Sequence, residues 1–284
     1  MANIGKYFEY NGASSKDYNL AIASFDRIDS YETGMSRDIQ KGAMNRYRWH
    51  PNHFGTVFSD VLSFKLILIK DVCENPNDLE FTRSEYRKVV AWLSEPEYPS
   101  LYHMTDFDED IYDEYEDYYG IFTDFENVAS GAIIGIECTF TCDSPFAYSA
   151  EQTLEFLLGD SDTQYGVQDV QKSIIPDSDM SYVYPVITIM PNDTTKITIT
   201  NITDNNQTMT LTPEAANDKI IIDCEKLTIT DYTGGYIPLV DLELAEPQDV
   251  YWLRFISGTQ NDIEVTGNAT VTMTYRTVRK VGAY

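Results

Sequence analysis

The sequence predicts a mainly β protein of two domains, with one packed helix in a β-barrel or sandwich-like first domain and a β-sandwich in the second. Three observations support this fold class. Apolar and polar residues alternate over many short segments, as in half-buried strands. Residues 83–94 alone show the apolar spacing of an amphipathic helix. The composition changes after Pro145, so we place the domains at residues 1–148 and 149–284.

Several segments carry the strand pattern. They are Leu62–Leu68, Ile134–Cys142, Thr195–Thr200, Ile220–Cys224, Leu227–Thr230 and Val271–Tyr275. The pair at 220–224 and 227–230 flanks Glu225 and Lys226, which predicts a tight two-residue hairpin. After Tyr182 the short strands alternate with turn residues, a spacing typical of a β-sandwich.

The predicted helix has a defined start, face and end. Thr82 and Glu85 form a capping box, in which each residue satisfies a free backbone amide of the first turn. Its apolar stripe consists of Tyr86, Val89, Val90 and Leu93. Pro96 prevents the helix from continuing. Because only one side is apolar, we expect the helix to lie against a sheet.

The charge of the chain excludes several function classes. Lys and Arg number 20 against 46 Asp and Glu, a formal net charge of −26. A protein that binds nucleic acid or an anionic membrane needs a basic face, so we expect neither specific nucleic-acid binding nor membrane insertion. No apolar stretch reaches the roughly 18 residues of a membrane helix, and no signal peptide is evident. We expect the four cysteines to be reduced, half-buried thiols.

No motif indicates catalysis, a metal or a cofactor. His50 and His53 bracket a proline, which argues against a helical ligand pair, and His103 is isolated. There is no nucleophile elbow and no phosphate-binding glycine loop. Carboxylate pairs are abundant only because the chain is acidic. We therefore expect a protein without catalytic residues, metal or cofactor.

Several segments taken together resemble the distal tail protein of long-tailed bacteriophages. They are Phe8–Gly12 with Ser15–Leu20, IECTFTCDSPFAYS (Ile136–Ser149), IIIDCEKLTIT (Ile220–Thr230), YWLRFISGTQNDIEVTG (Tyr251–Gly267) and VTMTYRTVR (Val271–Arg279). They keep the family's order and spacing from about residue 8 to residue 280. The turn at Gly258–Asn261 is one residue longer than in the family, which leaves the strand register there open.

The resemblance implies an architecture and a role. The first domain would be a ring-forming belt domain and the second a galectin-like β-sandwich. Six copies would form a homo-hexameric ring that continues the tail tube. Its partners would be the tube protein, the tail-tip protein and receptor-binding or fibre proteins. The protein would be a virion component, assembled in the bacterial cytoplasm, and the family offers no catalytic residues to transfer.

Two sets of residues are candidate sites. The first is an acidic segment that could line a DNA-conducting lumen, or contact a neighbouring subunit or the tail-tip protein: Asp106, Asp108, Glu109, Asp110, Asp113, Glu114, Glu116 and Asp117. The second belongs to an alternative function, a carbohydrate-binding module, whose platform would be Tyr232, Tyr236 and Trp252. A third function, cell-wall degradation, has no motif to support it.

Overall fold

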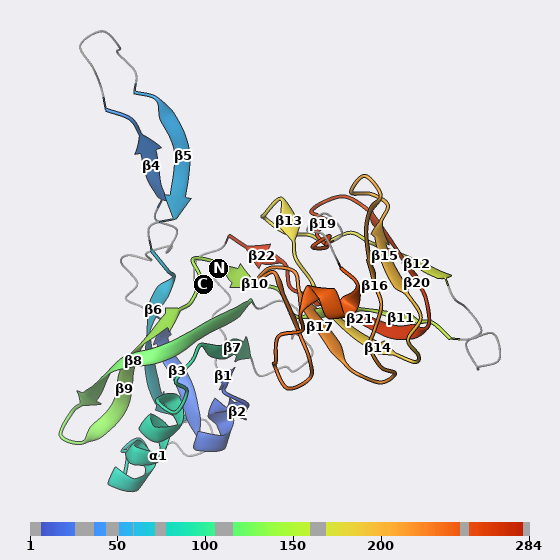
Figure 1. Cartoon of the computed structure of the whole chain (residues 1–284). Helices are drawn as coiled ribbons and strands as arrows, with labels where there is room; N and C mark the ends of the chain where they lie inside the picture. Colours follow the sequence, from blue (N-terminus) through green and yellow to red (C-terminus); the bar gives the residue numbers. More distant parts are fainter. Residues whose placement is uncertain are drawn as a thin grey trace. The chain divides into compact units, whose positions relative to one another are not determined.

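The structure, a computed structural model of the 284-residue chain, describes residues 7–25, 37–43, 51–58, 60–71, 78–105, 116–159, 169–244 and 250–280. Contacts divide the chain into two compact units, Met1–Ser149 with Arg279–Tyr284, and Ala150–Val278. Each unit consists mainly of strands around its own hydrophobic core (Figure 1). The mainly β fold class predicted from the sequence is confirmed.

The first unit is organised around one nine-stranded sheet, whose main path has the order β2-β1-β7-β8-β9-β6-β3 with antiparallel neighbours. These strands are β1 (Tyr7–Tyr10), β2 (Ala13–Ser14), β3 (Leu20–Phe25), β6 (Ser63–Lys70), β7 (Ser100–Thr105), β8 (Asp117–Ala129) and β9 (Ile133–Cys142). The short strands β10 (Ala147–Tyr148) and β22 (Val278–Arg279) pair with each other, and β10 also pairs with β8. The path ends at β2 and β3, so the described sheet is open rather than a closed barrel.

The two strands predicted in the first half are confirmed as β6 and β9, which pair directly. Their inward-facing cross-strand pairs are Phe64–Phe140, Leu66–Cys138 and Leu68–Ile136, and all six side chains are buried. Burying one large apolar side chain contributes about 1.5–3 kcal/mol. The alternation read from the sequence therefore identifies the face that builds the core.

Aromatic rings fill the rest of this core. Phe8 stacks on Trp92 and Tyr102, with ring centroids 5.6 and 5.2 Å apart. Tyr10 meets Phe122 edge-on at 4.9 Å. Such aromatic pairs contribute about 0.5–1.5 kcal/mol beyond the area they bury. They join β1, β7 and β8 to the helix that covers the sheet.

The helix α1 (Arg83–Leu93) forms where the sequence predicts and carries the predicted capping box. The Glu85 amide donates to the Thr82 hydroxyl at 3.3 Å, and the Glu85 carboxylate accepts from the Thr82 amide at 2.8 Å. Val89 and Leu93 of the predicted stripe are buried. Trp92, which the stripe omits, is also buried.

Trp92 joins the helix to the N-terminal segment. Its indole donates to the Tyr10 carbonyl at 3.2 Å. Its ring also stacks on Tyr18 at 4.3 Å, in the 3-10 helix η1 (Ser15–Tyr18). The side chain thus satisfies its one polar group while the rest of its ring fills the core.

A buried lysine fixes the start of α1 to the end of β6. The Lys70 side chain is 4% exposed and its ammonium lies 2.9 Å from Asp78 and 3.0 Å from Glu85. Burial alone would lower the pKa of Lys70, but the two carboxylates raise it above its ordinary value. Hydrogen bonds from Thr82 and Lys70 lower the pKa of Glu85 to about 2.

The second unit is a β-sandwich of a five-stranded sheet, β11-β21-β14-β17-β18, and a four-stranded sheet, β12-β20-β15-β16. The first contains β11 (Gln152–Leu157), β14 (Val186–Pro191), β17 (Ile220–Asp223), β18 (Thr228–Thr230) and β21 (Ala269–Tyr275). The second contains β12 (Asp169–Ile174), β15 (Ile197–Asn201), β16 (Gln207–Leu211) and β20 (Asn261–Thr266). A separate pair consists of β13 (Tyr182–Val183) and β19 (Phe255–Ile256).

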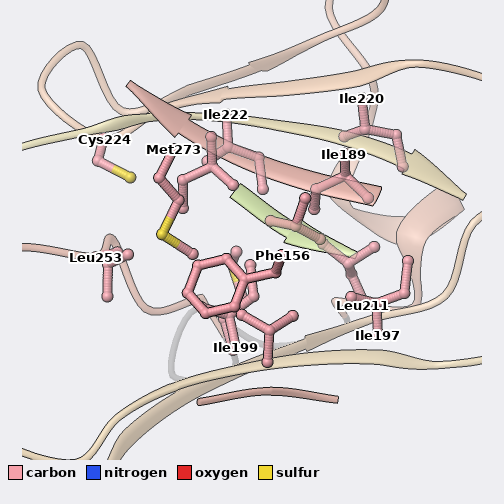
Figure 2. Close-up of a cluster of buried hydrophobic side chains, with 14 of the residues drawn as sticks. Phe156, Ile189, Ile197, Ile199, Leu211, Ile220, Ile222, Cys224, Leu253 and Met273 are labelled. Carbon is pink, nitrogen blue, oxygen red and sulfur yellow. The ribbon is translucent and has the colours of Figure 1, made fainter. Parts of the chain in front are cut away.

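Side chains of the two sheets meet in one core. Figure 2 shows Ile189 and Met273 of the five-stranded sheet pointing toward Ile197 and Ile199 of the four-stranded sheet, with Phe156 between them. All five are buried. The predicted strands at 195–200 and 271–275 therefore lie in different sheets and face each other.

The predicted hairpin between residues 220 and 230 exists, but the prediction of a two-residue turn is wrong. Asp223 lies opposite Thr228, so four residues form the loop. The Asp223 carboxylate accepts hydrogen bonds from the amides of Glu225 and Lys226 at 3.1 and 2.9 Å. Leu227 then takes a left-handed conformation, with φ of 57°. An aspartate that caps its own turn favours this longer loop.

Buried polar side chains fix two other segments of the sandwich. At the turn after β19, Asn261 is fully buried and bonds both the amide and the carbonyl of Ile256, at 2.7 and 2.9 Å. Asp204, 4% exposed, accepts from Arg254 at 2.8 and 3.1 Å and from the Tyr251 hydroxyl at 2.7 Å. The Arg254 hydrogen bonds, followed by that of Tyr251, hold the pKa of Asp204 below its ordinary value.

The cysteines are more deeply buried than predicted. Cys138, Cys142 and Cys224 are free thiols with relative exposures of 0, 4 and 0%. Burial raises the pKa of all three thiols. Cys73 lies outside the described residues. Within the described part of the chain, no helix is long and apolar enough to cross a membrane.

Candidate assembly surface

A two-stranded ribbon in the first unit has no covering layer among the described residues. It consists of β4 (Arg37–Lys41) and β5 (His53–Phe58), which form a sheet of their own. We call this ribbon the arm. Figure 1 draws it in blue, standing clear of the nine-stranded sheet. Every residue of β4 is exposed, and so are all residues of β5 before Phe58.

The base of the arm is held by aromatic contacts. Phe58 meets Phe146 edge-on at 4.7 Å, and the Arg37 guanidinium lies 5.7 Å from the Phe58 ring. Arg37 is directly opposite Phe58 in the register. These contacts fix where the ribbon leaves the unit but leave its length uncovered.

The exposed arm carries large apolar side chains. Ile39 is 58% exposed, Phe54 is 72% exposed and Val57 is 46% exposed. An isolated two-stranded hairpin is at best marginally stable in water. Its two edges also present unpaired backbone groups that can pair with another chain. A ribbon of this kind becomes more stable when a partner covers it.

The predicted acidic segment is only partly described. Asp106, Asp108, Glu109, Asp110, Asp113 and Glu114 lie outside the described residues. Glu116 is half-buried and precedes β8. Asp117 is buried and its Oδ1 lies 2.6 Å from Nδ1 of His103. His103, which the sequence alone indicated to be isolated, therefore has a carboxylate partner. In the isolated chain Asp117 belongs to the interior of the unit.

The predicted platform residues lie in two different environments. Tyr232 and Tyr236 are 74 and 78% exposed, at either side of one turn. Trp252 is half-buried and packs against the core of the sandwich. The two tyrosines therefore lie on the surface, whereas the tryptophan contributes to the packing of the sandwich.

The described residues contain no group of three or more His, Cys, Asp or Glu side chains placed to hold a metal ion. His53 is exposed on the arm, and His50 lies outside the described residues.

Comparison with known families bears on the whole chain. Residues 3–144 match a family described as "Phage tail protein N-terminal domain", and residues 146–275 match one described as "Phage tail C-terminal domain". The chain belongs to this phage tail protein family. The phage tail protein thus has a structural role in the virion tail, as the sequence resemblance implied.

Solved structures share the fold of this phage tail protein at low sequence identity. The crystal structure of the Dit protein of phage SPP1 matches with a TM-score of 0.58 and 11% identity, covering 95% of this chain and 98% of that one. Chains of the phage P2 baseplate, in its activated conformation with calcium and with strontium, match with TM-scores of 0.53 and 0.52 at 10% identity, covering 94% of this chain and 97% of theirs. No curated protein matches the sequence.

The sequence reading of the phage tail protein missed the arm, although one signal could have revealed it. Residues 37–58 contain four basic side chains and a single acid, Asp38, in a chain with a net charge of −26. The rest of the chain then holds 16 bases and 45 acids. A local reversal of charge of this size indicates a segment that contacts something acidic.

Proposed function

We propose that the protein is the hub at the distal end of the phage tail. It forms a homo-hexameric ring that joins the tail tube to the tail tip and carries docking sites for tail-tip and receptor-binding proteins. The likeness that carries this proposal extends over both units: the SPP1 protein, described as a paradigm of the hub adsorption apparatus, aligns over 95% of this chain. A structural role of this kind needs neither catalytic residues nor a cofactor.

The arm supports the self-assembly part of the proposal. Ile39, Phe54 and Val57 expose apolar surface that a neighbouring copy would cover. A ring of identical subunits uses one heterologous contact repeated around an axis, so one projecting ribbon per subunit is sufficient. The partner that this reasoning favours is a second copy of the same chain.

Charge also favours a second copy as the arm's partner. The segment 37–58 carries a formal charge of +3, whereas the remaining residues carry −29. A basic ribbon is attracted to an acidic body, and this attraction offsets part of the repulsion between subunits of equal sign. Arg37 and Lys41 are the described basic residues of the ribbon.

The acidity of the chain suits a ring around passing DNA. A negative lumen repels phosphate groups and so keeps the conduit from binding its contents. The acidic segment 106–117 is proposed either to border this lumen or to contact a neighbouring subunit or the tail-tip protein. Neutralising the seven acids of this segment other than the buried Asp117 should then impair DNA ejection or ring assembly. Normal ejection and normal rings would reject both versions.

The hub role is tested in virions. In cells infected by a phage that lacks this gene, complementation with the full chain carrying a small C-terminal tag should restore infectious particles. Electron microscopy with a tag-specific label should place it at the distal end of the tail. Label along the tail shaft, or at the head-proximal end, would contradict the proposal.

A further inference from the structure

A second exposed apolar surface lies in the sandwich unit, on the segment between residues 227 and 240. Its five large apolar side chains are Leu227 at 56% exposure, Tyr232 at 74%, Tyr236 at 78%, Leu239 at 39% and Val240 at 73%. We call this surface the tyrosine edge. Taking about 150–250 Å² for an aromatic side chain, it exposes roughly 600 Å². That approaches the roughly 800 Å² that each partner contributes to a standard protein interface.

The tyrosine edge is held in one conformation by its own hydrogen bonds. Tyr236 lies opposite Thr230 in an antiparallel bridge. The Ile237 amide continues this pairing by donating to the Ile229 carbonyl at 3.0 Å, and Ile229 is buried in the core below. These two contacts fix the backbone that carries Tyr236 at the edge of the five-stranded sheet.

Hydrogen bonds also hold the turn that carries the two tyrosines. The Asp231 carboxylate accepts hydrogen bonds from the amides of Thr233 and Gly235, at 2.7 and 2.9 Å. The Asp231 amide donates to the Gly235 carbonyl at 2.9 Å. A surface that is ordered before binding loses little conformational entropy when a partner docks. Tyrosine suits such a surface because its ring is large and rigid while its hydroxyl can stay hydrated.

The backbone of the tyrosine edge is poorly suited to strand addition. β18 is the last named strand of the five-stranded sheet, and an outer segment pairs with it through Tyr236 and Ile237. Pro238 lies in this outer segment and has no amide hydrogen to donate. A partner must therefore be recognised by side chains rather than by extension of the sheet.

The charge around the tyrosine edge restricts the kind of partner. Residues 223–243 contain five acids and one base, Lys226, which is paired with Asp223 at 3.1 Å. Glu225, Asp241 and Glu243 are exposed around the apolar side chains. This arrangement, an apolar centre with an acidic rim, fits a surface with apolar side chains flanked by Lys and Arg. A second sandwich unit does not fit, because residues 151–284 themselves hold 20 acids and 8 bases. The basic arm of a neighbouring copy is assigned to the ring contact in the proposed function, so a crosslink from this edge to the arm would count against the inference.

We infer that the tyrosine edge is the docking site for a different tail protein, one that presents a basic, partly apolar surface. The inference rests on the proposed hub role and names the surface through which the hub holds a peripheral component. Tyr232 and Tyr236 are the anchors, since exposed aromatic residues at the centre of a patch supply most of the binding energy in such interfaces.

The test uses complete tails assembled in infected cells, complemented in trans with the full chain. Tails carrying Tyr232→Ser with Tyr236→Ser are compared with wild-type tails and with tails carrying Tyr98→Ser, an equally exposed tyrosine in the first unit. Quantitative mass spectrometry should show one tail protein reduced about tenfold or more, since two anchors are lost. The Tyr98→Ser tails should keep the full composition.

A photo-crosslink identifies the contact directly. With Tyr236→p-benzoylphenylalanine, the crosslink should join this chain to the protein lost from the double variant, at a peptide rich in Lys and Arg. Crosslinks only to another copy of this chain, or an unchanged tail composition, would overturn the inference. So would tails of unchanged composition that lose binding to purified host cell-wall polysaccharide, the result expected of a sugar platform. If the wild-type chain is absent from the tail end, the proposed function fails instead.

Discussion

Replacing one side chain of the arm should weaken self-assembly by an amount that the structure predicts. Phe54 is 72% exposed in the isolated chain. An aromatic side chain has about 200 Å² to bury, so a neighbour could cover about 140 Å² of Phe54. At about 25 cal/mol per Å² this burial contributes about 3.5 kcal/mol, as an upper bound. Ordering of the side chain on association costs about 1 kcal/mol of this.

Phe54→Ser should therefore reduce the subunit association constant by about 30- to 300-fold. Sedimentation velocity over a concentration series measures this shift. The free energy of unfolding should change by less than about 0.5 kcal/mol, because the side chain is exposed before assembly. Tyr98→Ser, which removes a tyrosine that is 78% exposed elsewhere in the same unit, is the matched control. Unchanged assembly of Phe54→Ser, or an equal loss in Tyr98→Ser, would refute the reasoning.

Three further predictions concern charge and stability. Arg37→Glu with Lys41→Glu should weaken assembly in sedimentation experiments. The control, Arg87→Glu with Lys88→Glu on α1, also brings the net charge from −26 to −30 and should weaken assembly much less. Equal losses in the two double variants would mean that only net charge matters. Asp204→Asn should lower the free energy of unfolding by about 2–3 kcal/mol, less than a fully buried pair because Arg254 is 37% exposed. Since folding lowers the pKa of Asp204, this stabilisation is complete above its ordinary pKa of about 3.9 and is lost as the pH falls further. The free energies of unfolding of the wild type and of Asp204→Asn, measured by urea titration, should therefore converge in acid. A difference between them that widens in acid would contradict this. Gly120→Ala should lower the free energy of unfolding by about 3 kcal/mol in the same assay, because the added Cβ would lie 2.3 Å from the Thr141 carbonyl oxygen. An unaffected variant would show that β8 and β9 can separate locally.

The elements that the sequence predicted best are those in which local pattern and burial agree. Burial alternates along β6, and along β9 from Ile136 to Cys142, because one face of each strand contacts the core and the other faces away from it. α1 has its capping box and apolar stripe within one continuous segment. In these segments local sequence alone determines both the element and its buried face.

The strands that the sequence did not predict lack this agreement. β12 is almost entirely exposed, and β11 buries only Phe156, so neither shows an alternation of apolar residues. Their place in the sheets depends on pairing with β20 and β21, which are distant in the chain. Trp92 was missed for a related reason, since its partners Tyr18 and Tyr10 come from the N-terminal segment.

The candidate surfaces were predicted unevenly. Tyr232, Tyr236 and Trp252 were all chosen as aromatic residues, and each could equally have belonged to the core. The two tyrosines are exposed, whereas the side chain of Trp252 packs on the core. The arm escaped notice because neither of its faces is buried, so it has no hydrophobic period to detect. Its basic composition in an acidic chain was the one available signal.

The measurement that tests the central claim most directly is the mass of the purified full-length protein in solution, by analytical ultracentrifugation at near-physiological salt. The chain has a mass of 32.4 kDa, so the proposed ring of six predicts a species of about 194 kDa, or a multiple of it. That species should dissociate on deletion of the arm. A protein that stays at 32.4 kDa at all accessible concentrations, with or without the arm, would contradict the account.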